Sequence, residues 1–339
     1  MARNVRREQP EARFRLAAAA SMAAALIVLG AAPVRADDAW VSPIGRDHPL
    51  VGTIVRTADA TPIERSELFA ALARASYVLL GEKHDNADHH RLQAAAIAAL
   101  VAAGRRPTVA FEMLTADQAD RIAHHRRAAP ADIAGIARVA RWSESGWPAW
   151  PLYEPVFAAT VRAGLPIAAG GLETNEVRAV ARSGAAAIER TLARALIQRH
   201  PLSATAEDRV KATIAASHCG HAPAAALGGM IAAQRARDAA LALALLEAPT
   251  DSAVLIAGTG HVRADFGVPL LIAHAGATRP AATVAFVEVR ADRRTIGDYA
   301  DVFGVTPPPF DFLWFTPAVD DLDPCEKFRR ALERMRPRE

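Results

Sequence analysis

The sequence has 339 residues, of which 51% are hydrophobic and 23% are charged, with a formal net charge of +3. Residues 1–36 hold six Arg and two Glu, so residues 37–339 carry a net charge of −1. About 300 residues are enough for one large domain or two small ones, and a chain this close to neutrality gives no reason to expect nucleic acid as a partner.

Residues 1–36 are typical of a signal peptide. A basic leader precedes an apolar run from Leu16 to Ala32, and the small residues Val34 and Ala36 favour cleavage after Ala36. A membrane anchor is the alternative, but a run of about 17 residues is short for a span. No cysteine lies near the cleavage point, so a lipid anchor is not supported. We therefore expect a periplasmic or secreted protein.

Residues 37–62 are predicted to form an irregular N-terminal segment with a short edge strand at 51–55. Beyond it, strands and helices alternate, which is typical of a parallel sheet with helices on both faces. The sequence predicts strands at 77–80, 108–111, 165–169, 253–257, 283–289 and 312–315, and helices at 63–74 and 88–103 and from residues 115, 155 and 267. We therefore expect an α/β fold at 63–320, with a mostly parallel sheet flanked by helices, and a C-terminal tail at 321–339.

Two segments interrupt this alternation. Residues 129–152 contain three Trp among Ser, Gly and Pro, and are predicted to form a tryptophan-rich loop. Residues 173–248 are helical almost throughout and are predicted to form an inserted helical subdomain. Cys219 and Cys325 could pair in an oxidising compartment, but two cysteines do not define a disulfide framework.

The motif Gly-x-x-His follows two apolar strands, at Gly81 to His84 and at Gly258 to His261. Ligands of open parallel sheets bind beyond the carboxyl ends of the strands, where Glu82, Glu112 and Glu173 are also expected. Glycine at these turns permits close approach of the backbone to a ligand. We expect one common site at this edge of the sheet.

The residue types at this edge support two kinds of chemistry. His84 and His261 with Glu82 or Glu112 could hold zinc or a similar divalent ion with one open position. The same groups could act as general acid and base without a metal. The adjacent His89 and His90 point about 100° apart on a helix, so we expect at most one of them to face the site.

Tyr153 suggests a different chemistry. Haem iron accepts tyrosine as a protein ligand, and a porphyrin needs an apolar or aromatic slot such as Trp150 and the neighbouring prolines could provide. Ordinary packing of this ring is the alternative.

Several spaced motifs between residues 60 and 315 resemble those of one known family. They are Leu79 to Asn86, His89 to Gln93, Phe111-Glu112-Met113, Trp150 with Tyr153-Glu154-Pro155, Ser217 to Gly220, Gln234 with Arg237-Asp238, Gly258 to His261, and Gly267-Val268-Pro269. The chain resembles the ChaN-like family, bacterial haem-binding proteins of the cell envelope within the Tiki/TraB/erythromycin-esterase superfamily.

The resemblance implies an α/β core with a helical subdomain, haem bound at a homodimer interface, and a role in haem or iron acquisition with an uptake receptor at the envelope. The tyrosine iron ligand of the family is carried to Tyr153, with His84, His89 and Trp150 as further haem contacts. Many relatives are lipoproteins, and this chain departs from them in having no cysteine at the signal boundary.

In the enzyme branches of the superfamily, the catalytic or metal site would fall on His84, His261 and Glu112, with Arg237 binding an anion. The sequence thus supports two main hypotheses, an exported haem-binding protein and a metal-dependent hydrolase of the esterase or peptidase type. A periplasmic binding protein for another ligand is a third.

Overall fold

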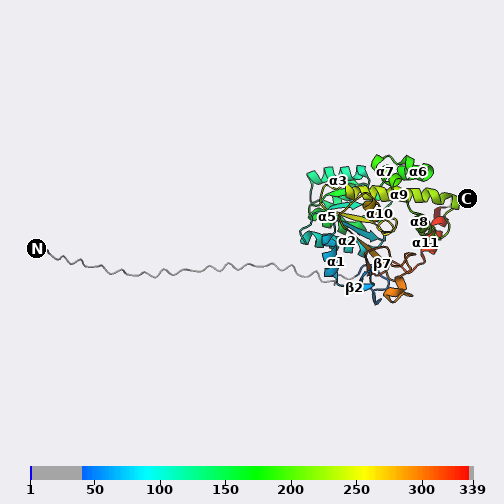
Figure 1. Cartoon of the computed structure of the whole chain (residues 1–339), viewed down its shortest axis with the longest axis horizontal. Coiled ribbons are helices and arrows are strands. Elements are labelled where there is room, and N and C mark those ends of the chain that lie inside the picture. The colour runs from blue at the N-terminus through cyan, green and yellow to red at the C-terminus, as the bar shows by residue number, and fades with distance from the viewer. Residues whose placement is uncertain (2–39, 336–339) are drawn as a thin grey trace. The chain divides into compact units, whose positions relative to one another are not determined.

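The computed structural model describes Met1 and residues 40–335, so the predicted signal peptide lies outside the described residues. Within them, eight strands form one sheet in the order β2-β1-β8-β7-β3-β6-β4-β5. Figure 1 labels the main helices and two of the strands. The strands are β1 Ile54–Arg56, β2 Thr61–Ile63, β3 Tyr77–Glu82, β4 Thr108–Phe111, β5 Ile167–Ala169, β6 Ala253–Gly258, β7 Ala281–Glu288 and β8 Phe312–Thr316. Strands β3 to β8 pair in parallel, and β1 is antiparallel to both of its neighbours. The predicted α/β fold is confirmed.

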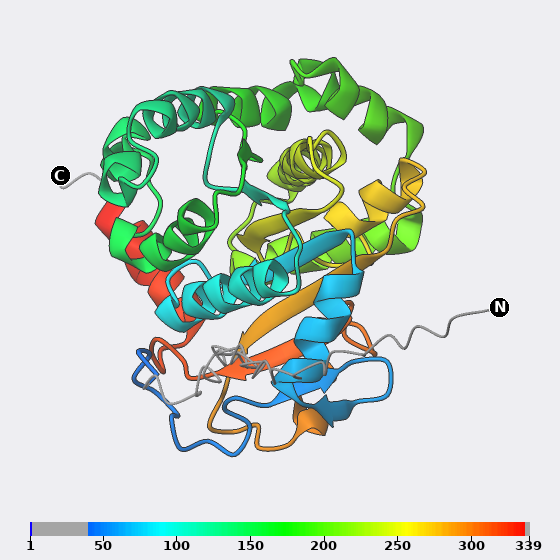
Figure 2. The ribbon, with the colours of Figure 1, turned by 90° about the vertical axis from the view of Figure 1, so that its left-hand side faces the viewer.

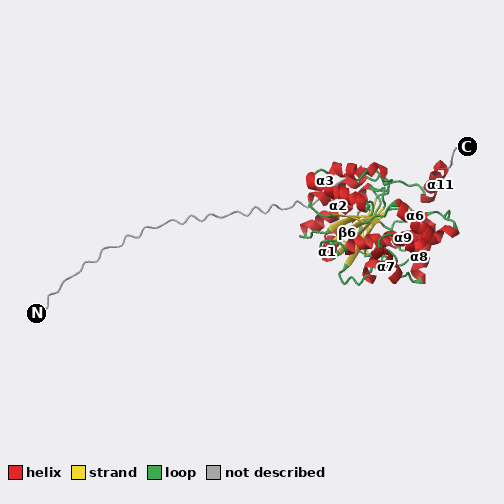
Figure 3. Ribbon diagram, turned by 90° about the horizontal axis from the view of Figure 1, so that it is seen from above, coloured by secondary structure: helices red, strands yellow, loops and turns green. Residues whose placement is uncertain are grey.

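Helices cover both faces of this sheet, with α2 and α3 on one side and α7 and α9 on the other (Figure 3). The α-helices are α1 Arg65–Arg74, α2 Ala87–Ala102, α3 Ala116–Ala128, α4 Ile133–Val139, α5 Trp150–Arg162, α6 Thr174–Ser183, α7 Thr191–Arg199, α8 Ala204–Ser217, α9 Ala224–Leu246, α10 Val268–His274 and α11 Pro324–Met335. Three 3-10 helices are η1 Trp142–Glu144, η2 Gly184–Ala187 and η3 Ile296–Tyr299. Helices α6 to α9 lie between β5 and β6 in the chain, where the sequence predicts a helical insertion.

The central strands are buried on both faces. In β3, Val78 and Leu80 pack into the core shared with α2 and α5, whereas Leu79 packs into the core shared with α9. Successive side chains of a strand point to opposite faces, so a strand covered on both sides is apolar at every position. This explains the uninterrupted apolar runs of β3 and β6, which pair side by side. Figure 2 shows the strands of the sheet enclosed by helices.

Two predictions from local composition differ from the structure. The segment predicted as a tryptophan-rich loop forms α4, η1 and the first turn of α5, because Asp132 caps α4 by accepting the amide hydrogen of Gly135 and Trp142 packs into the core. The short edge strand predicted at 51–55 is β1 at 54–56, but it lies inside the sheet between β8 and β2, and β2 begins within the same segment. Packing overrides the Gly, Ser and Pro signals in both segments.

A disulfide joins Cys219, after α8, to Cys325 in α11, with 5.3 Å between the Cα atoms. Among the described residues, no helix is both long enough and apolar enough to cross a membrane.

Candidate functional site

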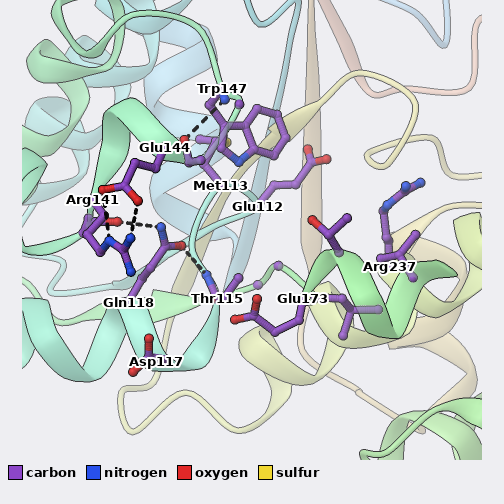
Figure 4. Close-up of a pocket in the computed structure, with 18 of the residues that line it drawn as sticks. Glu112, Met113, Thr115, Asp117, Gln118, Arg141, Glu144, Trp147, Glu173 and Arg237 are labelled. Carbon is purple, nitrogen blue, oxygen red and sulfur yellow. Dashed lines mark hydrogen bonds and ion pairs between the residues drawn. The ribbon is translucent and has the colours of Figure 1, made fainter. Parts of the chain in front are cut away.

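A cavity of about 950 Å³ lies where β3, β4, β5 and β6 end. His84 enters it after β3 and His261 after β6. Glu112 follows β4 and Arg237 comes from α9, and both line the cavity (Figure 4). The convergence predicted from the strand ends is therefore present. The cavity also contains Glu173, which follows β5.

The two Gly-x-x-His motifs lie on adjacent strands, since β3 pairs with β6 and Glu82 stands opposite Gly258. A Cβ atom on Gly81 would overlap Val262 and come within 3.0 Å of the Cα of Thr259. A Cβ atom on Gly258 would lie 3.0 Å from both Cε1 and Nε2 of His84. The two glycines therefore let the two turns approach each other. The imidazole of His84 packs directly against Gly258 of the other motif.

His84 is held by a buried carboxylate. Its Nδ1 lies 2.9 Å from Oε1 of Glu82, and its ring meets Trp147 edge-on with 4.9 Å between the ring centroids. Its Nε2 has no hydrogen-bond partner among the described residues, and 36% of the side chain is exposed. Burial lowers the pKa of His84, but its hydrogen bond to Glu82 and the charge of Glu112 outweigh burial and raise it. His84 thus presents one open nitrogen to the cavity.

Glu82 joins four neighbours below the cavity. It accepts hydrogen bonds from the Tyr153 hydroxyl at 2.9 Å and from the Gln93 amide at 2.7 Å, and His90 Nδ1 lies 3.2 Å from its second oxygen. Burial raises the pKa of Glu82, but the charge of His90 and the hydrogen bonds from His84 and His90 outweigh burial and lower it. The carboxylate is therefore ionised at neutral pH.

His261 is enclosed by two carboxylates. Its Nδ1 lies 2.6 Å from Asp238 and its Nε2 lies 3.2 Å from Glu112, which also accepts the amide hydrogen of Gly258. Burial lowers the pKa of His261, but the charges of Glu112 and Asp238 outweigh burial and raise it to about 10. Burial raises the pKa of Glu112, but His261 outweighs it and lowers that pKa to about 2. At neutral pH, His261 is therefore an imidazolium held between Asp238 and Glu112.

The residues assigned to haem from the sequence lie mostly behind the cavity. Tyr153, Trp150 and His89 do not line it, and Tyr153 has no exposed surface. Burial and then the charge of Glu82 raise the pKa of Tyr153, which is opposite to the tyrosinate that iron prefers. In this conformation, a ligand in the cavity reaches His84 and does not reach Tyr153.

His89 and His90 are both fully buried, but only His90 contacts the site. His89 Nδ1 accepts the Lys83 amide hydrogen at 2.9 Å, and its Nε2 lies 3.0 Å from the Thr316 hydroxyl. Burial lowers the pKa of His89 to about 3, so this ring is neutral. His89 is therefore a structural residue. This agrees with the expectation that at most one of the adjacent His89 and His90 faces the site.

The predicted metal set of His84, His261, Glu82 and Glu112 does not form a coordination shell. Among the described residues, no three His, Cys, Asp or Glu side chains are placed to hold a metal ion. Instead, the carboxylates face imidazole nitrogens, and both nitrogens of His261 are occupied in this way.

Sequence reasoning assigned no role to Asp238 or Trp147, which contact His261 and His84 respectively. Asp238 was detectable as a charged residue within an Ala- and Leu-rich helix, because a carboxylate on a buried helical face needs a partner. Trp147 carried no such signal beyond its tryptophan-rich segment.

The fold and the site define an α/β protein with two carboxylate–imidazole pairs in a cavity at the carboxyl ends of its parallel strands. Residues 68–272, more than half of the chain, match the model of a family described as "Haem-binding uptake, Tiki superfamily, ChaN". The chain belongs to this family.

Two solved structures resemble the chain. The structure described as cofacial heme binding to ChaN of Campylobacter jejuni has a TM-score of 0.61 at 18% identity, covering 77% of this chain and 95% of that one. The type III effector HopBA1 has a TM-score of 0.41 at 15% identity, covering 80% and 98%. The first supports the fold, and no curated protein sequence matches the chain.

Proposed function

We propose that this chain is a haem-binding protein that holds haem in its strand-end cavity through Nε2 of His84. One observation carries the proposal, namely that Nδ1 of His84 contacts buried Glu82 while Nε2 has no hydrogen-bond partner within residues 40–335. Histidines that bind metals almost always donate their second N–H to a carboxylate, carbonyl or water, which fixes the ring and increases its basicity. Haem iron accepts a histidine ligand of this kind.

The cavity is large enough for such a ligand. Its volume of about 950 Å³ lies at the upper end of the ~300–1,000 Å³ typical of small-molecule sites. Trp147 provides apolar surface on its wall, and the almost fully buried Met113 and Leu241 also line it. The remaining lining is mostly polar, so the cavity would leave part of a porphyrin uncovered.

We infer that a second copy of the chain covers the exposed porphyrin face. The related Campylobacter jejuni protein is described as binding haem cofacially, and two face-to-face haems would bury their apolar surfaces against each other. A homodimer with paired haems would complete a site that one polar-lined cavity leaves open. Sedimentation with and without haemin tests this, and a monomer in both states would contradict it.

We propose that the protein acts outside the cytoplasm, in haem or iron uptake. The leader at residues 1–36 and the disulfide between Cys219 and Cys325 support this location, because disulfides persist in oxidising compartments. Delivery to a receptor at the envelope is part of this proposal. Fractionation of cells that express the full chain checks it, and an uncleaved, reduced protein in the cytoplasm would contradict it.

Titration of the purified protein with haemin tests haem binding and the identity of the iron ligand. We expect a Soret band that His84→Ala abolishes or shifts and that Tyr153→Phe retains. Absence of the band in the wild-type protein at micromolar haemin would rule out the function. A band lost in Tyr153→Phe and kept in His84→Ala would instead assign the iron to the tyrosine.

Hydrolysis of an ester or peptide is the second candidate function. It is favoured by the group of Glu112, His261 and Asp238, which haem binding through His84 does not require. The neutral form of His84 could accept a proton from water at its open Nε2, while the enclosed His261 imidazolium supplies a fixed positive charge beside the reacting carbonyl. We expect His261→Gln to abolish any such activity and to retain the Soret band. Activity that survives His261→Gln would exclude this mechanism.

A further inference from the structure

Four arginines line the cavity, and they divide into two pairs with different surroundings. Arg121 donates from Nε to the Val139 carbonyl at 2.7 Å and forms an ion pair with Asp117. Arg141 donates to Glu144 from Nε at 3.0 Å and from Nη2. The charges of these two guanidinium groups are neutralised within the protein.

The other pair, Arg178 and Arg237, makes no hydrogen bond and no ion pair with any residue in the described part of the chain. Arg178 is on α6 and Arg237 is on α9, and these two helices pack against each other. In Figure 4, Arg237 stands on the opposite side of the cavity from the bonded pair of Arg141 and Glu144. The cavity is therefore polarised, with its unneutralised cations on the side of α6 and α9.

The surroundings of Arg237 make it available to bind an anion in the cavity. Its side chain is half-buried, and its neighbour Asp238 is turned away to His261. A partly desolvated cation without a protein partner is stabilised by an external anion. The guanidinium fork matches a carboxylate through two parallel hydrogen bonds. Glu173 also lines the cavity and is exposed, so it opposes an anion without neutralising either arginine.

We propose that Arg237 and Arg178 form a carboxylate-binding pole of the cavity, and that this pole binds the propionate groups of haem. The proposal rests on the proposed haem function, to which it adds an orientation, with the propionates toward α6 and α9. Glu112 disfavours a carboxylate near the strand ends, whereas the exposed Glu173, at the start of α6, borders the arginine side of the cavity. Arg237 and Arg178 are thus specificity residues for an acidic porphyrin, distinct from the iron ligand.

The test compares haemin with haemin dimethyl ester, in which both carboxylates are neutral, in the same buffer. We expect the wild-type protein to bind haemin about tenfold more tightly than the ester, as one charge-assisted interaction at the lower end of its range would give. Arg237→Gln should remove most of this preference by weakening haemin alone, and Arg178→Gln should have a smaller effect. Arg141→Gln is the matched control, because Arg141 lines the same cavity but is paired with Glu144.

The outcomes separate this proposal from the function on which it rests. If the wild-type protein binds neither ligand, haem binding itself is wrong. If it binds both equally, or if Arg237→Gln weakens both by the same factor, haem binding stands and the carboxylate pole is overturned. Loss of the preference in Arg141→Gln as well as in Arg237→Gln would also overturn it, because the effect would then be one of general charge.

Discussion

His84 and His261 follow the same Gly-x-x-His motif on neighbouring strands, yet their surroundings differ. The side chain of His84 is 36% exposed and contacts one carboxylate, whereas that of His261 is 9% exposed and contacts two. As a result, His84 keeps an open nitrogen and His261 keeps none.

The difference arises from the helices that cover each strand end. Helix α9 places Asp238 against His261, while α2 and α5 place Gln93 and Tyr153 below Glu82 and leave the cavity side of His84 uncovered. The strand-end motif therefore determines where an imidazole lies, and the packed helices determine what it can bind. His84 is therefore suited to bind a ligand atom, and His261 is suited to hold a fixed positive charge.

Replacing the carboxylate beside each histidine, Glu82 for His84 and Glu112 for His261, should give the largest difference in haem affinity. Glu82→Gln should weaken haem binding by about 10–100-fold, the usual cost of losing the group that orients a metal-bound histidine. Glu112→Gln should change haem binding much less, because Glu112 bonds to His261 and acts on His84 only through its charge. Haemin titrations measure both, with circular dichroism to confirm folding. Equal losses in the two variants would mean that both histidines hold the ligand.

The two histidines should affect the protein at opposite ends of the pH range, His84 through haem affinity at low pH and His261 through stability at high pH. A proton on His84 competes with iron, so haem affinity should fall by up to about tenfold per pH unit below the raised pKa of His84. Because the pKa of His261 is about 10 in the folded protein, its stabilising contribution is complete below about pH 6.5 and is lost as pH rises through 10.

Affinities relative to His84→Ala at each pH, and unfolding free energies of the apoprotein with His261→Gln as control, measure the two effects. A flat affinity ratio would exclude His84 as the ligand. An alkaline loss of stability that persists in His261→Gln would assign that loss to another group.

Adding one methyl group beneath His84 should have a smaller effect. The Cβ of Gly258→Ala would lie 3.0 Å from two ring atoms of His84, so the ring must shift by a few tenths of an ångström. We expect haem affinity to fall several-fold with little change in folding, because a misplaced ligand loses alignment. Gly260→Ala is the control, since a Cβ there meets nothing within 4 Å. Equal behaviour of the two variants would show that the His84 ring is not held in place.

The sequence predicted the shared edge of the site because the pattern that marks a strand also fixes where it ends. The apolar runs before Gly81 and Gly258 identify buried parallel strands, whose carboxyl ends lie together in this fold. Thus His84, His261, Glu112 and Glu173 were predicted to be near one another, and the structure brings them into one cavity. Arg237 lines the same cavity, but only the family resemblance assigned it to the site.

The role of each residue was less accessible, because it depends on helices whose rotation the sequence does not specify. Tyr153 sits among aromatic residues in the sequence, which favours a porphyrin slot, but α5 turns its hydroxyl inward to Glu82. Asp238 belongs to a helix far along the chain, and only tertiary packing brings it to His261. The tryptophan-rich segment was predicted as a loop because local Gly, Ser and Pro signals do not include the burial of Trp142.

Tyr153→Phe should have the smallest effect on haem affinity. It therefore tests whether His84, and not Tyr153, is the iron ligand. Tyr153 and His84 both contact Oε1 of Glu82, so removing the hydroxyl leaves this oxygen to His84 alone. We expect an unchanged Soret band and an affinity equal to or slightly above that of the wild-type protein. The free energy of unfolding should fall by about 1.5–3 kcal/mol, the contribution of a hydrogen bond to a charged group. Urea unfolding of the apoprotein and haemin titration separate the two effects. A loss of affinity without a loss of stability would place the phenol at the iron and would reverse the roles of the two residues.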